Sequence, residues 1–297
     1  MVSRIYNRVA KSYDRDWSGI YASARDHCMA QIAAQLELPQ RRLDTVDFGI
    51  GTGNSIRDLG KLVPLGSCTG FDLSAGMLNQ AARKLGPGVR LIEGDAIDAP
   101  AYLGPESIDL ALCHFLLSFV DAGELLQVAF RLLRPGGLLS LATSTQRSLQ
   151  QLHSGRFRRT GQLFGVRRAL SKVTTPADHR QCLEMLQHHG FEIVSDHLHR
   201  QEVSFESFSD IREWALNSGW VAGSLNRHTA LRIAGCTTVF ALARIFMHPL
   251  YPIDAVNEIS IVLARKPVVE NARAPALVLH GARSPTPDPG NGVRVQG

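Results

Sequence analysis

Cysteine is scarce in this sequence, and no two cysteines lie close together along the chain. Five are spread over 297 residues, and none forms a Cys-x-x-Cys pair. An odd number of distant cysteines argues against a disulfide framework and against a cysteine-rich zinc site. We therefore expect a reducing compartment, the cytoplasm, for this protein.

Histidines accompanied by acidic residues at metal-ligand spacing are also missing. The pairs His188/His189 and His197/His199 fall on a predicted helix end and a predicted strand, and no carboxylate accompanies them at that spacing. The sequence therefore predicts no metal site.

Long apolar runs are absent as well. Residues 1–17, MVSRIYNRVAKSYDRDW, contain no apolar stretch that could serve as a signal peptide. The most apolar later segment, residues 230–251, is interrupted by Arg232 and Arg244. We expect no segment that spans a membrane.

Charge of one sign is only slightly in excess. The chain has 32 Lys and Arg against 27 Asp and Glu, a net charge of +5. This excess permits anionic partners but is too small to require a nucleic acid. The basic segment 147–172 contains arginines and a lysine without any acidic residue. It is interpreted either as a solvated face or as a dock for an anionic partner.

Strand-like and helix-like patterns alternate through the first half of the chain. Such alternation is typical of parallel strands joined by helical crossovers, with ligands at the carboxyl ends of the strands. We predict an α/β fold with a doubly wound, mostly parallel seven-stranded sheet. Strands are expected at residues 43–50, 66–73, 89–96, 107–117, 136–144, 191–203 and 257–266.

Less regular segments flank this alternation and suggest the domain organisation. Residues 1–40 are expected to form an N-terminal helical lid, and residues 41–266 the main domain. A helical insertion rich in large apolar side chains is expected at about 204–256. Residues 267–297 are rich in Pro, Gly, Ala and Arg without periodicity, which predicts a disordered tail.

Three glycines at alternate positions, Gly49, Gly51 and Gly53, follow the first predicted strand. Their spacing differs from the Gly-x-Gly-x-x-Gly of dinucleotide sites, and no Lys-Ser/Thr follows as in a phosphate loop. The loop therefore predicts close approach of an uncharged or zwitterionic ligand. Asp47 precedes the loop, and Asp72 ends the next strand, where a carboxylate can accept hydrogen bonds from both ribose hydroxyls.

Four motifs follow one another along residues 5–145. They are VDFGIGTGNS at 46–55, GFDLSAGML at 70–78, EGDA at 93–96 and LLRPGGLLSLAT at 132–143. In this order they resemble the motifs of class I S-adenosylmethionine-dependent methyltransferases. The resemblance is to the small-molecule branch, which includes ubiquinone/menaquinone C-methyltransferases and malonyl-carrier-protein O-methyltransferases.

The resemblance implies a Rossmann-like methyltransferase fold and S-adenosyl-L-methionine as cofactor. It places the three glycines along the methionine part and Asp47 near its amino group. It assigns Asp72 to the ribose, and Asp95 with the backbone of Ala96 to the adenine edge. Other interpretations stay open: the glycines could only make a tight turn, Asp72 could cap a helix beside Ser74, and Asp95 could be a solvated turn residue.

Two aromatic residues and one histidine complete the predicted site. Tyr6 and Tyr13 are seven residues apart, so both are expected on one face of a helix. Tyr13 is assigned to a lid over the cofactor, as the resemblance implies, and Tyr6 to packing on the domain. His114 ends the fourth predicted strand, where it could abstract a proton or only shape the pocket.

The function predicted is methyl transfer to a small, hydrophobic acceptor such as an aromatic, polyketide-like, quinone-precursor or prenyl metabolite. Two alternatives remain: an anionic acceptor, free or bound to an acidic carrier protein, and a non-catalytic protein that binds S-adenosylmethionine. Nucleic acid is not expected, because no Asn/Asp-Pro-Pro-aromatic tetrad follows the fourth strand and no RNA-binding module is present.

Overall fold

A computed structural model describes residues 2–15, 18–35, 42–153, 175–217 and 251–268 of the chain. The chain divides into the units Met1–Pro267 and Val268–Gly297, and the described helices and strands all belong to the first unit. Much of the basic segment, part of the predicted insertion and nearly all of the predicted tail lie outside the described residues.

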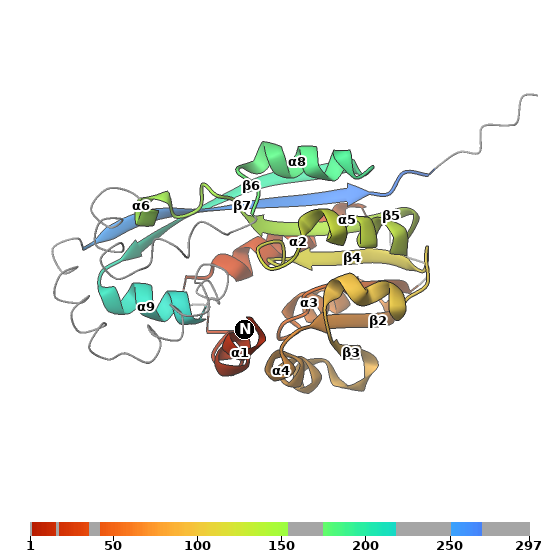
Figure 1. Cartoon of the computed structure of the whole chain (residues 1–297), viewed down its shortest axis with the longest axis horizontal. Helices are drawn as coiled ribbons and strands as arrows, with labels where there is room; N and C mark the ends of the chain where they lie inside the picture. Colours follow the sequence, from red (N-terminus) through yellow and green to blue (C-terminus); the bar gives the residue numbers. More distant parts are fainter. Residues whose placement is uncertain (1, 16–17, 36–41, 154–174, 218–250, 269–297) are drawn as a thin grey trace, which may run out of the picture. The chain divides into compact units, whose positions relative to one another are not determined.

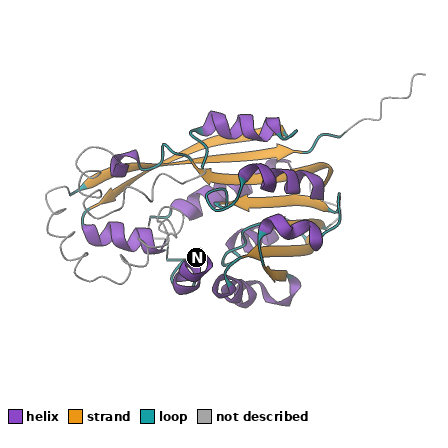
Figure 2. Cartoon of the chain, in the orientation of Figure 1, coloured by secondary structure: helices purple, strands orange, loops and turns teal. Residues whose placement is uncertain are grey.

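Seven strands form one open sheet in the order β3-β2-β1-β4-β5-β7-β6 (Figures 1 and 2). The strands from β3 to β5 pair in parallel, and β7 runs antiparallel to both of its neighbours. The predicted doubly wound, mostly parallel sheet is confirmed. The strands are β1 Leu43–Asp47, β2 Leu65–Asp72, β3 Arg90–Glu93, β4 Ile108–His114, β5 Leu133–Ser144, β6 Glu192–Phe205 and β7 Ile253–Arg265.

Helices cover both faces of this sheet, and each face has its own apolar core. One core includes buried residues of α2, α3 and α4, and the other includes buried residues of η2, α5 and α8. The described helices are α1 Val2–Val9, α2 Ile20–Gln35, α3 Asn54–Leu62, α4 Ala75–Leu85, η1 Gly86–Gly88, η2 Ala96–Ala101, α5 Ala122–Leu132, α6 Gln150–His153, α8 His179–His188 and α9 Phe208–Asn217.

Side-chain caps fix where several helices begin beside the strand ends. Ser74 accepts a hydrogen bond from the backbone N–H of Met77 at the start of α4, as the sequence predicted. Asp121 and Asp178 cap α5 and α8 in the same way. Because β1 pairs in parallel with β2 and β4, the carboxyl ends of these three strands open toward a common edge of the sheet.

Two segments differ from the local expectations. Helix α1 ends at Val9, so Tyr13 lies in the turn after the helix and not on the same helical face as Tyr6. Strand β6 continues to Phe205, and α9 follows it within the region assigned to an insertion. Phe205 and Trp214 are both buried, and their rings pack edge to face with centroids 5.7 Å apart, so these two aromatics belong to the core.

No helix in the described ranges combines the length and the apolar character that crossing a bilayer requires.

Candidate cofactor pocket

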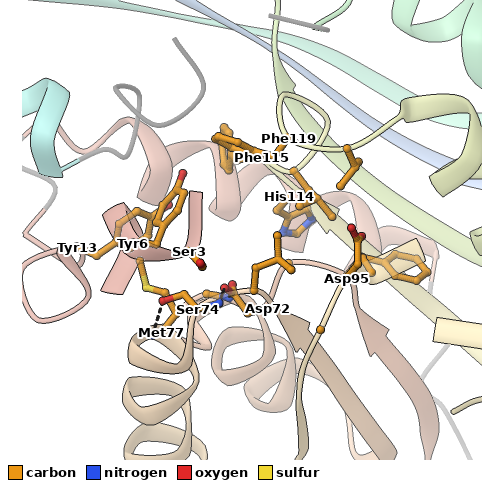
Figure 3. Close-up of a pocket in the computed structure, with 18 residues that line it drawn as sticks. Ser3, Tyr6, Tyr13, Asp72, Ser74, Met77, Asp95, His114, Phe115 and Phe119 are labelled. Carbon is orange, nitrogen blue, oxygen red and sulfur yellow. Dashed lines mark hydrogen bonds between the residues drawn. The ribbon is translucent and has the colours of Figure 1, made fainter. Parts of the chain in front are cut away.

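An open pocket lies where the loops after β1, β2, β3 and β4 meet (Figure 3). In Figure 3, Tyr6 and Tyr13 lie at one end and Asp95 at the other, with Asp72 between them. The lining includes the predicted residues Tyr13, Gly49, Gly51, Asp72, Asp95, Ala96 and His114. Asp47 and Gly53 are not among the lining residues.

The glycine loop joins β1 to α3, and two of its glycines border the pocket. Gly51 has a positive φ of 54°, and its backbone N–H donates to a carboxylate oxygen of Asp72 at 3.0 Å. A Cβ on Gly49 would lie 3.3 Å from the Leu116 side chain, so a larger residue would crowd the cavity wall. These glycines therefore leave the backbone accessible to a ligand.

Gly53 serves a different contact from the other two glycines. It precedes α3 with φ at 83°, and a Cβ there would lie 2.7 Å from Cδ1 of Leu85 in α4. The absence of a side chain lets the start of α3 pack against α4. Gly53 thus supports the glycine loop through the packing of α3 against α4 and does not line the pocket.

Asp72 is held at the end of β2 by two backbone donors. Its Oδ1 accepts from Ser74 N–H at 2.8 Å, and its Oδ2 accepts from Gly51 N–H at 3.0 Å. Burial raises the pKa of Asp72, and these two hydrogen bonds act against that rise. Each carboxylate oxygen has more than one acceptor position, so Asp72 can hold the loop and still accept hydroxyl groups of a ligand.

Asp47 lies behind the loop with only 2% of its surface exposed. Its Oδ1 accepts from Gly49 N–H at 3.2 Å. Burial, helped by the negative charge of Asp72 and opposed by the hydrogen bond from Gly49, raises the pKa of Asp47 to about 7. A cationic ligand group near this carboxyl would favour its ionised form.

Asp95 and Ala96 line the end of the pocket beyond β3. The Asp95 side chain accepts from Ile97 N–H at 3.2 Å and caps the 3-10 helix η2. The Asp95 carboxylate therefore has a local structural contact, as the turn interpretation left open by the sequence allowed. This contact does not remove Asp95 from the pocket, because one carboxylate can accept several hydrogen bonds.

The N-terminal segment covers the opposite end of the pocket. The rings of Tyr6 and Tyr13 meet edge to face with centroids 6.0 Å apart, although α1 ends between them. Tyr6 also meets Phe119 at 5.7 Å, and Tyr13 stacks on Tyr21 of α2 at 6.4 Å. Tyr6, assigned to packing from the sequence, both packs and lines the pocket.

Polar ties fasten this cover to the glycine loop and to α4. Oδ1 of Asn7 accepts from Ser74 Oγ and from Gly76 N–H, both at 2.7 Å. Oδ1 of Asp14 accepts from Thr52 Oγ1 at 2.6 Å and from Asn54 Nδ2 at 2.9 Å. These four contacts join residues 7 and 14 to the region that carries the glycine loop and the start of α4.

Lys84 completes the tie at Asp14. Its ammonium group lies 2.8 Å from Oδ2 of Asp14 and 3.2 Å from Thr52 Oγ1. Burial alone would raise the pKa of Asp14, but hydrogen bonds from Lys84, Thr52 and Asn54 lower it overall. Asp14 is therefore a carboxylate at neutral pH. We call Asp14, Thr52, Asn54 and Lys84 the lid tie.

His114 forms part of the pocket wall at the end of β4. Its Nδ1 lies 3.0 Å from Ser55 Oγ, and its Nε2 lies 3.0 Å from Ser140 Oγ. Burial, together with the smaller effect of the nearby Arg25, lowers the pKa of His114 to about 4. The imidazole is consequently neutral at pH 7, with a hydroxyl group at each ring nitrogen.

An apolar wall was not assigned from the sequence. Several apolar lining residues come from the loop after β4, where the run FLLSFV follows His114 without a helical or alternating pattern. That apolar run was the one feature of the sequence that could have indicated the wall. The additional lining residues are Ser3, Tyr6, Phe48, Leu73, Ser74, Met77, Gly94, Phe115, Leu116, Phe119 and Val120.

Comparison with known proteins is consistent with this arrangement. A family described as "Methyltransferase domain" matches residues 45–137. Trans-aconitate 2-methyltransferase of Deinococcus radiodurans is 30% identical over 167 residues, which cover 51% of this chain and 61% of that protein. Malonyl-[acyl-carrier protein] O-methyltransferase of Methylococcus capsulatus is 28% identical over 150 residues, covering 50% and 52%.

Residues 45–137 are thus similar to a methyltransferase domain, and both named relatives are methyltransferases by name. Among solved structures, the YcgJ protein of Bacillus subtilis has a TM-score of 0.52 at 14% identity, over 82% of this chain and 99% of that one. This likeness supports the fold alone. The chain spans between half and two thirds of the length of the two named relatives.

The matched region and the pocket overlap only in part. Residues 45–137 supply the glycine loop, Asp72, Asp95 and the apolar wall after β4. The cover formed by Tyr6 and Tyr13 lies outside the matched region. The family match therefore includes the loops at the strand ends but not the N-terminal cover.

Proposed function

We propose that the protein binds S-adenosyl-L-methionine in this pocket and transfers its methyl group to a small-molecule acceptor. The observation that carries the proposal is the pocket itself, in which an open glycine loop and the carboxylates of Asp72 and Asp95 face one cavity. A Cβ at Gly49 would crowd that cavity, and Asp72 keeps acceptor positions free, so the residues present fit a nucleoside with an amino-acid chain.

When bound, the cofactor supplies a methyl group on a positively charged sulfur. Gly49 and Gly51 would border its methionine part, with the carboxyl of Asp47 behind the loop. Asp72 would accept hydrogen bonds from the ribose, and Asp95 with Ala96 would contact the adenine edge. Tyr6 and Tyr13 would cover the site and exclude water, which favours an aligned displacement.

His114 is the titratable side chain on the wall formed by β4. A pKa of about 4 makes it a weak proton acceptor, and both nitrogens already lie near hydroxyl oxygens. These contacts support a positioning role, in which His114 holds Ser55 and Ser140 and shapes the wall. Proton abstraction by His114 would require one of these hydroxyl contacts to open.

We infer that the acceptor is hydrophobic, because aromatic and aliphatic side chains form its side of the pocket. Phe115, Leu116, Phe119 and Val120 contribute to that wall, together with Tyr6. A flat apolar metabolite could pack against these rings. The relatives' names favour a second candidate, since trans-aconitate and malonyl-carrier protein both present carboxylates. For such an acceptor the basic segment 147–172 would be the contact surface.

Calorimetry with S-adenosylmethionine and S-adenosylhomocysteine tests the cofactor site. Both should bind, and Asp72→Ala should weaken binding by ~1.5 to 3 kcal/mol, the scale of charge-assisted hydrogen bonds. Asp98→Ala is the matched control, because Asp98 is an exposed carboxylate of η2 that does not line the pocket. Equal affinity in wild type and Asp72→Ala would remove Asp72 from the site.

Incubation with methyl-labelled S-adenosylmethionine and a metabolite extract tests transfer and identifies the acceptor. Binding without any labelled product would favour the non-catalytic alternative. Charge reversal of Arg158, Arg159, Arg167 and Arg168 to Glu separates the two acceptor classes. Turnover should persist for an apolar acceptor, whereas salt-sensitive loss of turnover would favour an anionic or carrier-bound one.

A further inference from the structure

Three histidines from distant parts of the sequence meet on the face of the sheet covered by α2. The ring centroids of His27 and His197 are 4.4 Å apart, and those of His27 and His199 are 5.0 Å apart. One ring nitrogen of each histidine lies within 4.8 Å of the corresponding nitrogen of the other two. None of the three lines the cofactor pocket. We call them the histidine cluster.

The backbone explains why these side chains converge. His197 and His199 are two residues apart on β6, and alternate residues of a strand point to the same face. They pair with Ile261 and Ile259 of β7, whose side chains belong to the core that also includes buried residues of α2. The helix thus lies over this part of the sheet and brings His27 to its edge.

The surroundings of the two β6 histidines favour their neutral forms. Partial burial lowers the pKa of His197 and His199, and the proximity of His27 lowers both further. Asp196 acts in the opposite sense on His197, but its Oδ2 lies 2.8 Å from Nε2 of His179 in α8. Neutral imidazole has the free lone pair that a metal ion requires.

The distances are close to those of a metal-bound set. Zinc–nitrogen bonds of ~2.0–2.1 Å in tetrahedral geometry place ligand nitrogens about 3.4 Å apart. Moving nitrogens that now lie within 4.8 Å of one another requires side-chain rotation, mainly of the rings of His27 and His197, which are stacked at 23°. His197 is exposed and can turn. Ser23 Oγ lies 3.3 Å from Nε2 of His199 and can orient that ring as an outer-shell group does.

We propose that His27, His197 and His199 form a binding site for one divalent first-row transition metal ion, with zinc as the reference ion. Three imidazoles suit zinc, cobalt, nickel or copper, and they leave a coordination position for water. The prediction of no metal site rested on the lack of a nearby carboxylate along the sequence. The third imidazole comes from α2, which local spacing could not reveal.

Such an ion would join α2 to the edge strand β6. Helix α2 also carries Tyr21, whose ring meets Phe115 of the pocket wall edge to face at 4.7 Å. A metal bridge at His27 would therefore stiffen an element that supports the pocket.

Titration of the full chain, prepared without a histidine tag, with zinc ions in a calorimeter tests this proposal. We expect one equivalent to bind and the melting temperature to rise. His197→Ala should weaken binding by at least about 100-fold, because even outer-shell partners of metal ligands change affinity by 10–100-fold. His27→Ala should do the same. His197 is exposed, so its replacement should leave the fold intact, which the melting temperature without metal checks.

His188→Ala is the matched control. His188 is an exposed histidine whose ring lies 5.4 Å from that of His189, a pair without a third histidine among the described residues. This variant should bind zinc as the wild type does. Equal weakening in His188→Ala and His197→Ala, or no binding by the wild type, would overturn the proposal.

Cobalt provides a second readout of the ligand type. Cobalt bound by imidazoles should show visible d–d bands without the intense near-ultraviolet bands of thiolate ligands. A thiolate spectrum would assign the metal to a cysteine and refute the histidine cluster. Cys28, next to His27, is buried and its pKa is raised to about 12, which makes a thiolate there costly. These measurements do not depend on methyl transfer.

Discussion

The lid tie makes a quantitative prediction about how the N-terminal cover controls cofactor binding. Asp14→Ala removes the acceptor for Thr52, Asn54 and Lys84 at once. Hydrogen bonds to a buried charged group contribute ~1.5–3 kcal/mol each, but exposed ion pairs contribute only ~0.2–1 kcal/mol. The Asp14 side chain is 44% exposed. We therefore expect the whole tie to stabilise the covered state by about 1–2 kcal/mol.

Loss of this stabilisation should appear in the affinity for S-adenosylmethionine. A ligand that needs the covered state binds more weakly in proportion to the loss of that state. A change of about 1–2 kcal/mol corresponds to a decrease of at most about 5–30-fold in affinity, reached when the uncovered state predominates in the variant. Calorimetry measures the affinity, and limited proteolysis with and without ligand measures exposure of residues 2–15. Cleavage there should be faster in Asp14→Ala and should slow less on ligand addition.

Lys61→Ala is the matched control for this prediction. Lys61 forms an ion pair with Asp58 at 2.8 Å on α3 and takes part in none of the contacts of the lid tie. Its loss should leave cofactor affinity unchanged. If Asp14→Ala lowers the melting temperature but binds S-adenosylmethionine as tightly as the wild type, the segment is a structural support and the lid interpretation is refuted.

Three further predictions concern residues around the pocket and the chain end. The folded-state pKa of His114 is about 4, below the unfolded value of about 6.5, so stability should fall by at most about 3 kcal/mol as pH drops between these values. Denaturant titration should show that His114→Gln loses most of this dependence, and an unchanged pH profile would contradict it. Gly53→Ala should lower the free energy of unfolding by ~1–3 kcal/mol, because φ is 83° and the added Cβ would collide with the Leu85 side chain. The residues that line the pocket should stay in place. A melting temperature equal to that of the wild type would refute this prediction. Truncation after Lys266 should preserve folding and cofactor binding, and a large fall in melting temperature would show that residues 267–297 stabilise the domain.

The sheet was predictable because each strand is signalled by its own residues. The runs that end at Asp47, Asp72 and His114 are largely buried, as parallel strands covered on both faces require, and helical patterns separate them. Asp72 and Asp95, at the ends of two neighbouring strands, could be placed in one pocket for the same reason. Parallel strands end at one edge, so their order along the chain is enough to bring the ends together.

Contacts between distant segments were not predictable in this way. Nothing in the local pattern around Asp14 indicates that Lys84 will meet it, and nothing around His27 indicates β6. The seven-residue spacing of Tyr6 and Tyr13 predicted a shared helical face, yet the helix ends between them and the rings still meet. Tertiary packing, which local periodicity does not encode, decides such contacts.

In the proposed site, the residues at the strand ends bind the cofactor, whereas contacts between distant segments form the cover over it. The groups assigned to the cofactor, from Gly49 to Ala96, lie inside the region that the family shares. The two named relatives are each similar to about half of this chain, and their names carry different acceptors. Acceptor choice therefore has to depend on particular side chains within the matched region or on surfaces outside it. In this chain the described candidates are the wall after β4, which lies within residues 45–137, and the cover that carries Tyr6 and Tyr13, which lies outside them. Because the lid tie fastens that cover to the glycine loop, a substitution in the acceptor-facing surface of the cover should also change the affinity for the cofactor.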